Sequence, residues 1–179
     1  MTTPSVERSG PASSRTTPPP HAAAPEAVGL DPRLTSPALA GYDGCFGCGG
    51  QSASGLRIKR TGQRDGVATA EYTVRREHQG APGLAHGGVL TTAMDEMLGT
   101  AAWLLGKRYV TGRLETDFLA PVPVGVTLYL RGWCTGVDGR KAYLESEGRV
   151  GAPDGPVAVR AAALFVEVPE EHFVKNRAN

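Results

Sequence analysis

The 179-residue sequence has almost no excess charge, few aromatic side chains and only three cysteines. Its formal net charge is +1, with 19 Lys and Arg against 18 Asp and Glu, so no overall field favours a nucleic-acid backbone or an anionic membrane. Cys45, Cys48 and Cys134 are too few, and odd in number, for a scaffold held by disulfides. We therefore expect neither nucleic acid nor membrane among the partners of this protein.

Long apolar runs and a secretory signal are also missing. The N-terminal residues contain no apolar stretch of the kind that signals carry. The longest apolar stretch, residues 89–105, has Asp95 and Glu96 at its centre, which makes insertion into a bilayer costly. These features predict a soluble, cytoplasmic protein.

Proline is concentrated at one end of the chain, where 8 of the 14 prolines lie between Pro4 and Pro37 among many Ser, Thr and Ala residues. Such a segment buries too little apolar surface to offset the entropy of ordering it. We therefore predict a flexible tail over residues 1–40 and one folded domain over residues 41–179.

The remaining sequence predicts an α+β fold. Two strands are expected at residues 56–59 and 67–74, joined by the turn TGQRDG. A helix is expected over residues 87–105, with an apolar stripe of Leu90, Met94, Met97, Ala101 and Leu104. Four strands follow at residues 109–119, 126–135, 140–150 and 157–168. With no second helix to cover a parallel sheet, we expect an antiparallel sheet of about five to six strands wrapped around one long central helix.

The predicted helix carries two acids on an otherwise uncharged surface. Between residues 87 and 106, Asp95 and Glu96 are the only charged side chains. Either they reach solvent or a paired Arg, or the sheet or another subunit covers this face and an acid lies in a cleft that tunes its pKa. The periodicity does not choose between the two acids, because both lie off the apolar stripe.

His86, Gly87 and Gly88 lead directly into the first turn of this helix. Backbone N–H groups there lack intrahelical partners, and the helix dipole favours negative charge. The segment is either an ordinary helix start or a site that stabilises an oxyanion, with a carboxylate two turns further along.

The run HQGAPGLAHGGVLTTAMDE, followed by YVTGRLETDFLAPVPVG, resembles the hotdog-fold acyl-CoA thioesterases of the phenylacetate-pathway (PaaI-like) type. The spacing from the HGG motif to Asp95 matches that family. The segment CFGCGGQSASGLRI resembles another segment common in these proteins, but has Gln51 and Ser52 where Asn-Pro is usual. The resemblance covers residues 44–168 and leaves out the tail.

This resemblance implies a site and an assembly. The Gly88 N–H would polarise the thioester carbonyl, Asp95 would act as general base or nucleophile, and Thr111 would position the carboxylate or the attacking water. Substrate-binding roles fall to His86, Gly87 and Gln79. In the family the strand Thr or Ser comes from the partner subunit, so the resemblance implies a homodimer or a dimer of dimers. It implies no metal and no cofactor.

Each assignment has a structural alternative. Asp95 can pair with an Arg at an interface, and Thr111 can be present for its β propensity. His86 can satisfy loop backbone groups instead of contacting substrate. Glu96 is interpreted as a solvated or supporting acid.

Cys45 and Cys48 have the CxxC spacing of a zinc knuckle or a redox pair. A structural zinc site needs four ligands, and no second matching pair is present in the sequence. A redox pair of the thioredoxin type needs a helix start within a βαβ pattern, which the sequence does not predict. We interpret these cysteines as a loop packed against the core, with zinc or redox roles as minor alternatives.

Two hypotheses for function follow. One is the hydrolysis of acyl-CoA thioesters to free acid and CoA. The other is a non-catalytic hotdog protein that binds acyl-CoA or another small ligand. A hydratase of the same fold is less favoured, because the paired Asp and His of those helices are not seen here.

Overall fold

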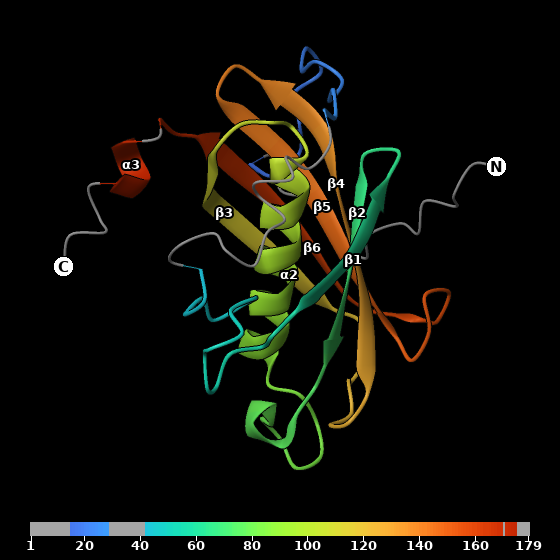
Figure 1. Cartoon of the computed structure of the whole chain (residues 1–179). Helices are drawn as coiled ribbons and strands as arrows, with labels where there is room; N and C mark the ends of the chain where they lie inside the picture. Colours follow the sequence, from blue (N-terminus) through green and yellow to red (C-terminus); the bar gives the residue numbers. More distant parts are fainter. Residues whose placement is uncertain (1–14, 29–41, 170, 175–179) are drawn as a thin grey trace.

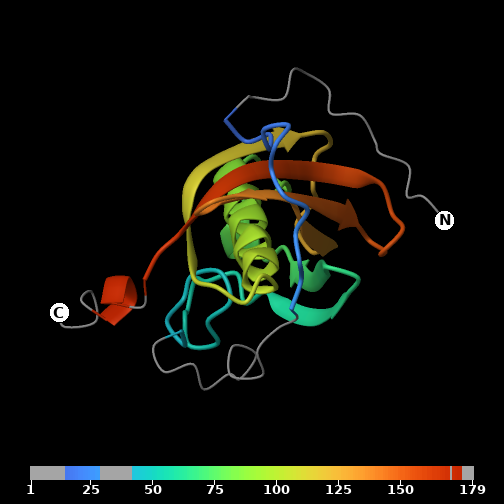
Figure 2. The ribbon, with the colours of Figure 1, turned by 90° about the horizontal axis from the view of Figure 1, so that it is seen from above.

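The computed structural model describes residues 15–28, 42–169 and 171–174. Helix α2, Gly87–Trp103, lies along the concave side of one antiparallel sheet (Figure 1). Figure 2 shows from above how the sheet curves around this helix. The six strands, in the order β1-β2-β4-β5-β6-β3, are Lys59–Arg64 (β1), Val67–Thr73 (β2), Tyr109–Phe118 (β3), Thr127–Asp138 (β4), Lys141–Val150 (β5) and Val157–Glu167 (β6). The predicted α+β architecture is confirmed.

Two short helices complete the described fold. The 3-10 helix η1, Arg76–His78, lies in the loop before α2, and α3, Glu171–Val174, follows β6. In the part of the chain that the structure describes, no helix is both long and apolar enough to cross a membrane. The cytoplasmic location stays a prediction from the sequence.

The predicted apolar stripe of α2 forms the centre of the core. Leu90 is 4% exposed, and Met94 and Met97 are fully buried against the sheet. Gly132 of β4 allows the helix to come close, because a Cβ at this position would lie 2.9 Å from the Met97 carbonyl oxygen. Helical periodicity in the sequence therefore identified the face that the sheet covers.

Strands β3 to β6 begin within one residue of their predicted starts. The first predicted strand, residues 56–59, was wrong, because β1 occupies the residues interpreted as a turn. Leu56 and Ile58 give the segment an alternating apolar pattern because both side chains are buried. They nevertheless belong to a loop, and their N–H groups donate hydrogen bonds to the carbonyls of Phe46 and Gly47. The strand itself is almost entirely exposed and has no apolar alternation to reveal it.

The β1–β2 hairpin turns at Asp65 and Gly66, which have φ angles of 51° and 76°. Two successive residues with positive φ are typical of a type I′ turn, for which Asp-Gly is a favoured pair. The turn signal in TGQRDG was therefore correct for its last two residues, while the preceding four belong to β1.

Part of the proline-rich segment lies against the sheet. Ala23 pairs with Val137 near the end of β4, and the buried Thr16 donates a hydrogen bond of 2.9 Å to Glu115 of β3. Pro18 and Ala22 lie over Gly136, which leaves no space for a Cβ. Composition did not indicate this packing of residues 15–28. The rest of the predicted tail, residues 1–14 and 29–40, lies outside the described residues.

Candidate active site

Asp95 and Thr111 meet at one face of α2. Asp95 lies two turns into the helix and is half-buried. The Thr111 hydroxyl of β3 donates a hydrogen bond of 2.9 Å to Asp95 Oδ1 within the same chain. The resemblance implied that the strand Thr would come from the partner subunit, and the structure instead joins the two residues in one chain.

A β-bulge lies next to Thr111. In the pairing of β3 with β6, Thr111 faces Phe165 and Arg113 faces Leu164, so Gly112 is the extra residue. Bulges turn the neighbouring side chains of a strand and are common beside active sites. A Cβ on Gly112 would lie 3.3 Å from the Leu164 carbonyl oxygen, so a small residue fits best here.

Glu96 points away from this site, as expected for the next residue of a helix, which is turned by about 100°. Its carboxylate lies 3.8 Å from Nη2 of Arg60 and accepts a weak hydrogen bond from the Cys45 thiol at 3.7 Å. The sequence left the choice between the two acids open. The structure gives the two acids different partners: Glu96 contacts Arg60 and Cys45, while Asp95 accepts a hydrogen bond from Thr111.

The helix begins with His86 as its N-cap, in the extended conformation with φ −68° and ψ 136°. His86 Nδ1 accepts a hydrogen bond of 2.9 Å from the Gly88 N–H, and its carbonyl accepts from the N–H groups of Val89 and Leu90. The Gly88 N–H, to which the resemblance assigned the oxyanion role, is therefore occupied in this conformation. Gly87 is the first helical residue, and its N–H has no intrahelical partner.

A pocket of about 370 Å³ opens at this end of α2. Its apolar walls come from the helix start, the loop before it and the end of β3, through Leu84, Gly87, Leu90, Phe118, Leu119 and Val122. Phe118 and Leu119 are 55% and 40% exposed, which is unusual for large apolar side chains. A small acyl or aryl group would bury apolar surface here.

Gln79 holds the loop that forms one wall of this pocket. Its side-chain oxygen accepts a hydrogen bond of 2.8 Å from the Gly83 N–H. The buried His78 beside it lies with Nδ1 2.8 Å from the Tyr72 hydroxyl. Burial, followed by the nearby Arg75 guanidinium, lowers the pKa of His78 below the ordinary 6.5. The loop is therefore built around a neutral imidazole.

Asp95 does not line the pocket at Gly87 of its own chain. The two residues are eight positions apart, which corresponds to about 12 Å along an α-helix. A thioester carbonyl that accepts from one N–H lies about 3 Å from it. One chain alone therefore does not bring the Gly87 N–H and its own Asp95 to the same carbonyl.

Residues 82–154 match the family model of the thioesterase superfamily. A stretch of 90 residues is 29% identical to acyl-coenzyme A thioesterase THEM4 of Xenopus laevis, covering 50% of this chain and 40% of that protein. The Bos taurus protein of the same name is 30% identical over 93 residues, covering 52% and 38%. The chain thus spans less than half the length of the curated relatives it matches.

Solved structures agree on the fold. One thioesterase superfamily protein superposes with a TM-score of 0.62 and 35% identity, over 66% of this chain and 60% of that one. The Escherichia coli PaaI protein of the phenylacetic acid degradation operon gives a TM-score of 0.59 at 19% identity, over 64% and 81%. These matches confirm the resemblance: residues 82–154 match the thioesterase superfamily, and the architecture around them is the hotdog fold.

Proposed function

We propose that this protein hydrolyses acyl-CoA thioesters to the free acid and CoA. The named activity of the THEM4 relatives supports this substrate class. Among proteins of the same fold, one from Streptococcus mutans has been solved with acetyl-CoA and a hypothetical thioesterase from Streptococcus pneumoniae with coenzyme A. The apolar pocket at the N-terminus of α2 supplies a place for the acyl group.

The chemistry needs few groups. Attack on a thioester builds negative charge on the carbonyl oxygen, and a fixed N–H donor stabilises it best where water is excluded. The Gly87 N–H is the donor we assign, because that of Gly88 is engaged by His86. Asp95 acts as general base on water or as the nucleophile, and the Thr111 hydroxyl holds its carboxylate. A thiolate leaves readily, so no strong general acid is required.

A complete site on this scheme takes two chains. Gly87 and Asp95 lie about 12 Å apart along one helix. If the α2 of a second copy lies antiparallel beside the first, Gly87 of one copy comes close to Asp95 of the other. β3, which carries Thr111, is an edge strand paired on one side with β6. Pairing of two β3 edges about a two-fold axis would bring the two helices together. We therefore propose a homodimer in which Gly87 of one copy faces Asp95 and Thr111 of the other.

The spacing of the two side chains offers further support. A hypothetical thioesterase from Streptococcus pneumoniae has been solved with an Asp-to-Ala change and with a Thr-to-Ala change, at positions 16 residues apart. Asp95 and Thr111 are separated by the same number of residues. His86 and Gln79 contribute by fixing the loop and the helix start, and Gly87 offers its N–H to the substrate.

The hydrogen bond from Thr111 to Asp95 is the observation that carries this proposal, and three variants test it. Asp95→Asn keeps the shape of the side chain but is a poor base, so thiol release should fall at least ~100-fold. Gly87→Pro removes the N–H and should keep the helix start, because proline suits the first helical position and His86 already has the extended backbone that precedes proline. Gly87→Ala is the matched control, since it keeps the N–H.

We expect Gly87→Pro to lose ~100- to 1,000-fold in kcat and Gly87→Ala to lose much less. Activity is measured as thiol release from acyl-CoAs of graded chain length. Equal activity of the Pro and Ala variants would remove the Gly87 N–H from the mechanism.

The alternative, a protein that binds acyl-CoA without hydrolysis, is favoured by one observation: Asp95 lies outside the pocket of its own chain. Wild-type protein that binds acyl-CoA in calorimetry but releases no thiol would establish this alternative. Turnover by the wild type that Asp95→Asn abolishes would exclude it.

A further inference from the structure

Two cysteines and an acid converge on a second face of α2, turned by about 100° from the face that carries Asp95. The loop of residues 42–58, here called the cysteine loop, brings the Cys45 and Cys48 sulfurs and a Glu96 oxygen to within 4.8 Å of one another. All three residues are half-buried. Among residues 15–28, 42–169 and 171–174, no other three His, Cys, Asp or Glu side chains come together in this way.

Backbone hydrogen bonds hold the cysteine loop in shape. The Gly49 N–H donates to the Cys45 carbonyl at 2.9 Å, and the N–H groups of Leu56 and Ile58 donate to the Phe46 and Gly47 carbonyls. Gly47 packs directly on the Glu96 carboxylate, where a Cβ would overlap Oε2. The loop is therefore preorganised, and the glycine inside the CxxC sequence lets the acid approach both sulfurs.

The separations suit a tetrahedral metal ion. Zn²⁺ binds thiolate at about 2.3 Å and carboxylate at about 2.0–2.2 Å, so a sulfur and an oxygen on one ion lie about 3.5 Å apart. The Cys45 sulfur and Glu96 Oε2 are 3.7 Å apart. Thiolate ligands select zinc over magnesium or calcium. The missing second pair of ligands, which argued against zinc in the sequence, is replaced in part by a helix residue that spacing could not reveal.

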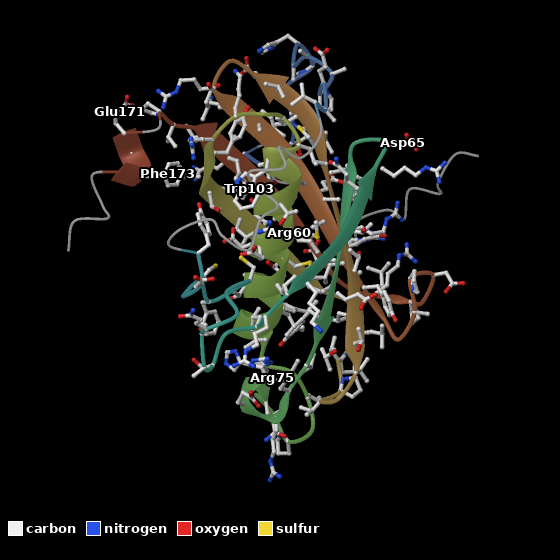
Figure 3. The ribbon with its side chains drawn as sticks, viewed as in Figure 1. Arg60, Asp65, Arg75, Trp103, Glu171 and Phe173 are labelled. Atoms are coloured by element: carbon white, nitrogen blue, oxygen red, sulfur yellow. The ribbon has the colours of Figure 1, made fainter. Side chains whose placement is uncertain are left out.

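Charge also fits a divalent cation. Once a bound ion displaced the two thiol protons, two thiolates and a carboxylate would bring three negative charges together. Arg60 lies close by, with Nη2 3.7 Å from the Cys48 sulfur and 3.8 Å from Glu96. Its guanidinium lies over the ring of Trp103, the last residue of α2, 4.6 Å from the centroid (Figure 3). Zn²⁺ and Arg60 together would neutralise the three anions, with Arg60 as hydrogen-bond donor to sulfur.

We propose that Cys45, Cys48 and Glu96 bind one Zn²⁺ ion, with a fourth position open to water, and that the ion fastens the cysteine loop to α2. Neither Asp95 nor Gly87 is a ligand, so this proposal is independent of the proposed hydrolysis. In this proposal the ion holds the cysteine loop on α2 and takes no part in hydrolysis, so the expectation that the reaction uses no metal is unchanged.

Zinc titration of the reduced, chelator-stripped full chain in competition with a chromophoric chelator tests the proposal. We expect one Zn²⁺ per chain for the wild type and for Cys134→Ser, the matched control, whose sulfur lies on β4 by the Gly136 carbonyl. Cys45→Ser and Cys48→Ser should each lose more than ~100-fold in affinity and Glu96→Gln at least ~10-fold, since supporting residues alone are worth ~10–100-fold. Unchanged affinity in the Cys45→Ser/Cys48→Ser double variant would overturn the proposal.

A second measurement uses the unaltered chain and so does not depend on any variant folding. Zinc should slow alkylation of Cys45 and Cys48, located by mass spectrometry, and leave Cys134 unaffected. Equal alkylation rates with and without zinc would overturn the proposal. So would a Cys45–Cys48 disulfide, formed with dilute hydrogen peroxide as oxidant, at a rate that zinc does not change.

Discussion

Thr111 and Asp95 are joined by a 2.9 Å hydrogen bond between a strand and a helix of one chain. Because both belong to the same copy, a site completed by a second copy must receive the Gly87 N–H, and not the threonine, from its partner. This assignment of site residues to the two subunits can be tested by mixing two inactive variants.

An equal mixture of Asp95→Asn and Gly87→Pro chains should recover about one quarter of wild-type activity after subunit exchange, because half of the dimers are mixed and one of their two sites is intact. A mixture of Asp95→Asn and Thr111→Ala chains should recover nothing, since no pairing restores both residues to one site. The measurement is thiol release after exchange, with mixed dimers verified by affinity tags. Recovery in the second mixture alone would place Asp95 and Thr111 in different subunits.

Gly132→Ala should lower the free energy of unfolding by about 1–3 kcal/mol, because the new Cβ would press on the Met97 carbonyl oxygen, which the helix cannot move cheaply. Gly62→Ala is the control, since a Cβ there would meet only the Thr69 hydroxyl at 3.6 Å. Urea unfolding of both variants measures the difference. Equal midpoints would mean that α2 is packed less tightly on β4 than described.

Stability should fall as the pH drops below about 6.5. Burial and Arg75 lower the pKa of His78 in the folded chain, so the unfolded chain binds more protons over this range and acidification favours unfolding. The stability contribution is full above the unfolded pKa and is lost as the pH approaches the lower folded value. Urea unfolding at pH 7.5 and 5.5 should show a smaller pH dependence for His78→Asn than for the wild type. An identical dependence would assign the effect to other groups.

Removal of the packed proline-rich segment should weaken the fold without abolishing it. We propose residues 41–179 as the folding unit, and a chain that begins at residue 41 should retain the circular dichroism of the sheet but melt at a lower temperature. Thr16→Val, which loses the hydrogen bond to Glu115, should cost about 0.5–1.5 kcal/mol. Melting temperatures equal to that of the full chain would show that residues 15–28 add nothing to stability.

Most helices and strands of the fold could be located from the sequence. The α2 stripe, β2 and the first half of β4 could be located because each buries apolar side chains at a regular spacing. Strands β3, β5 and β6 could be located because turn signals separate them in the sequence. β1 could not be located, because its residues are exposed and show no regular apolar spacing. Leu56 and Ile58, which lie in a loop, show the apolar alternation that is typical of a strand.

The contacts around the candidate site could not be predicted from the sequence. The HGG spacing pointed to Asp95, yet only tertiary contacts separate it from Glu96, which faces the cysteine loop. His86 caps the helix by accepting a hydrogen bond from the Gly88 N–H. This contact depends on the side-chain conformation of His86, which residue spacing does not determine. The bulge at Gly112 could not be predicted from the sequence either, because it arises from the register of β3 against β6.

The two borders of the sheet differ in a way that limits assembly. β1 carries the exposed Lys59 and Arg64 and has no acid of its own, and its register shifts near Gly62. If the β1 of another copy approached this border, the positive side chains of the two strands would repel each other and the irregular backbone would not pair well. Both features are known to prevent the addition of a strand to a sheet edge. If two copies join through β3, the outer borders of the shared sheet are both β1, so the sheet does not extend beyond two chains and the protein is protected from polymerising into fibres.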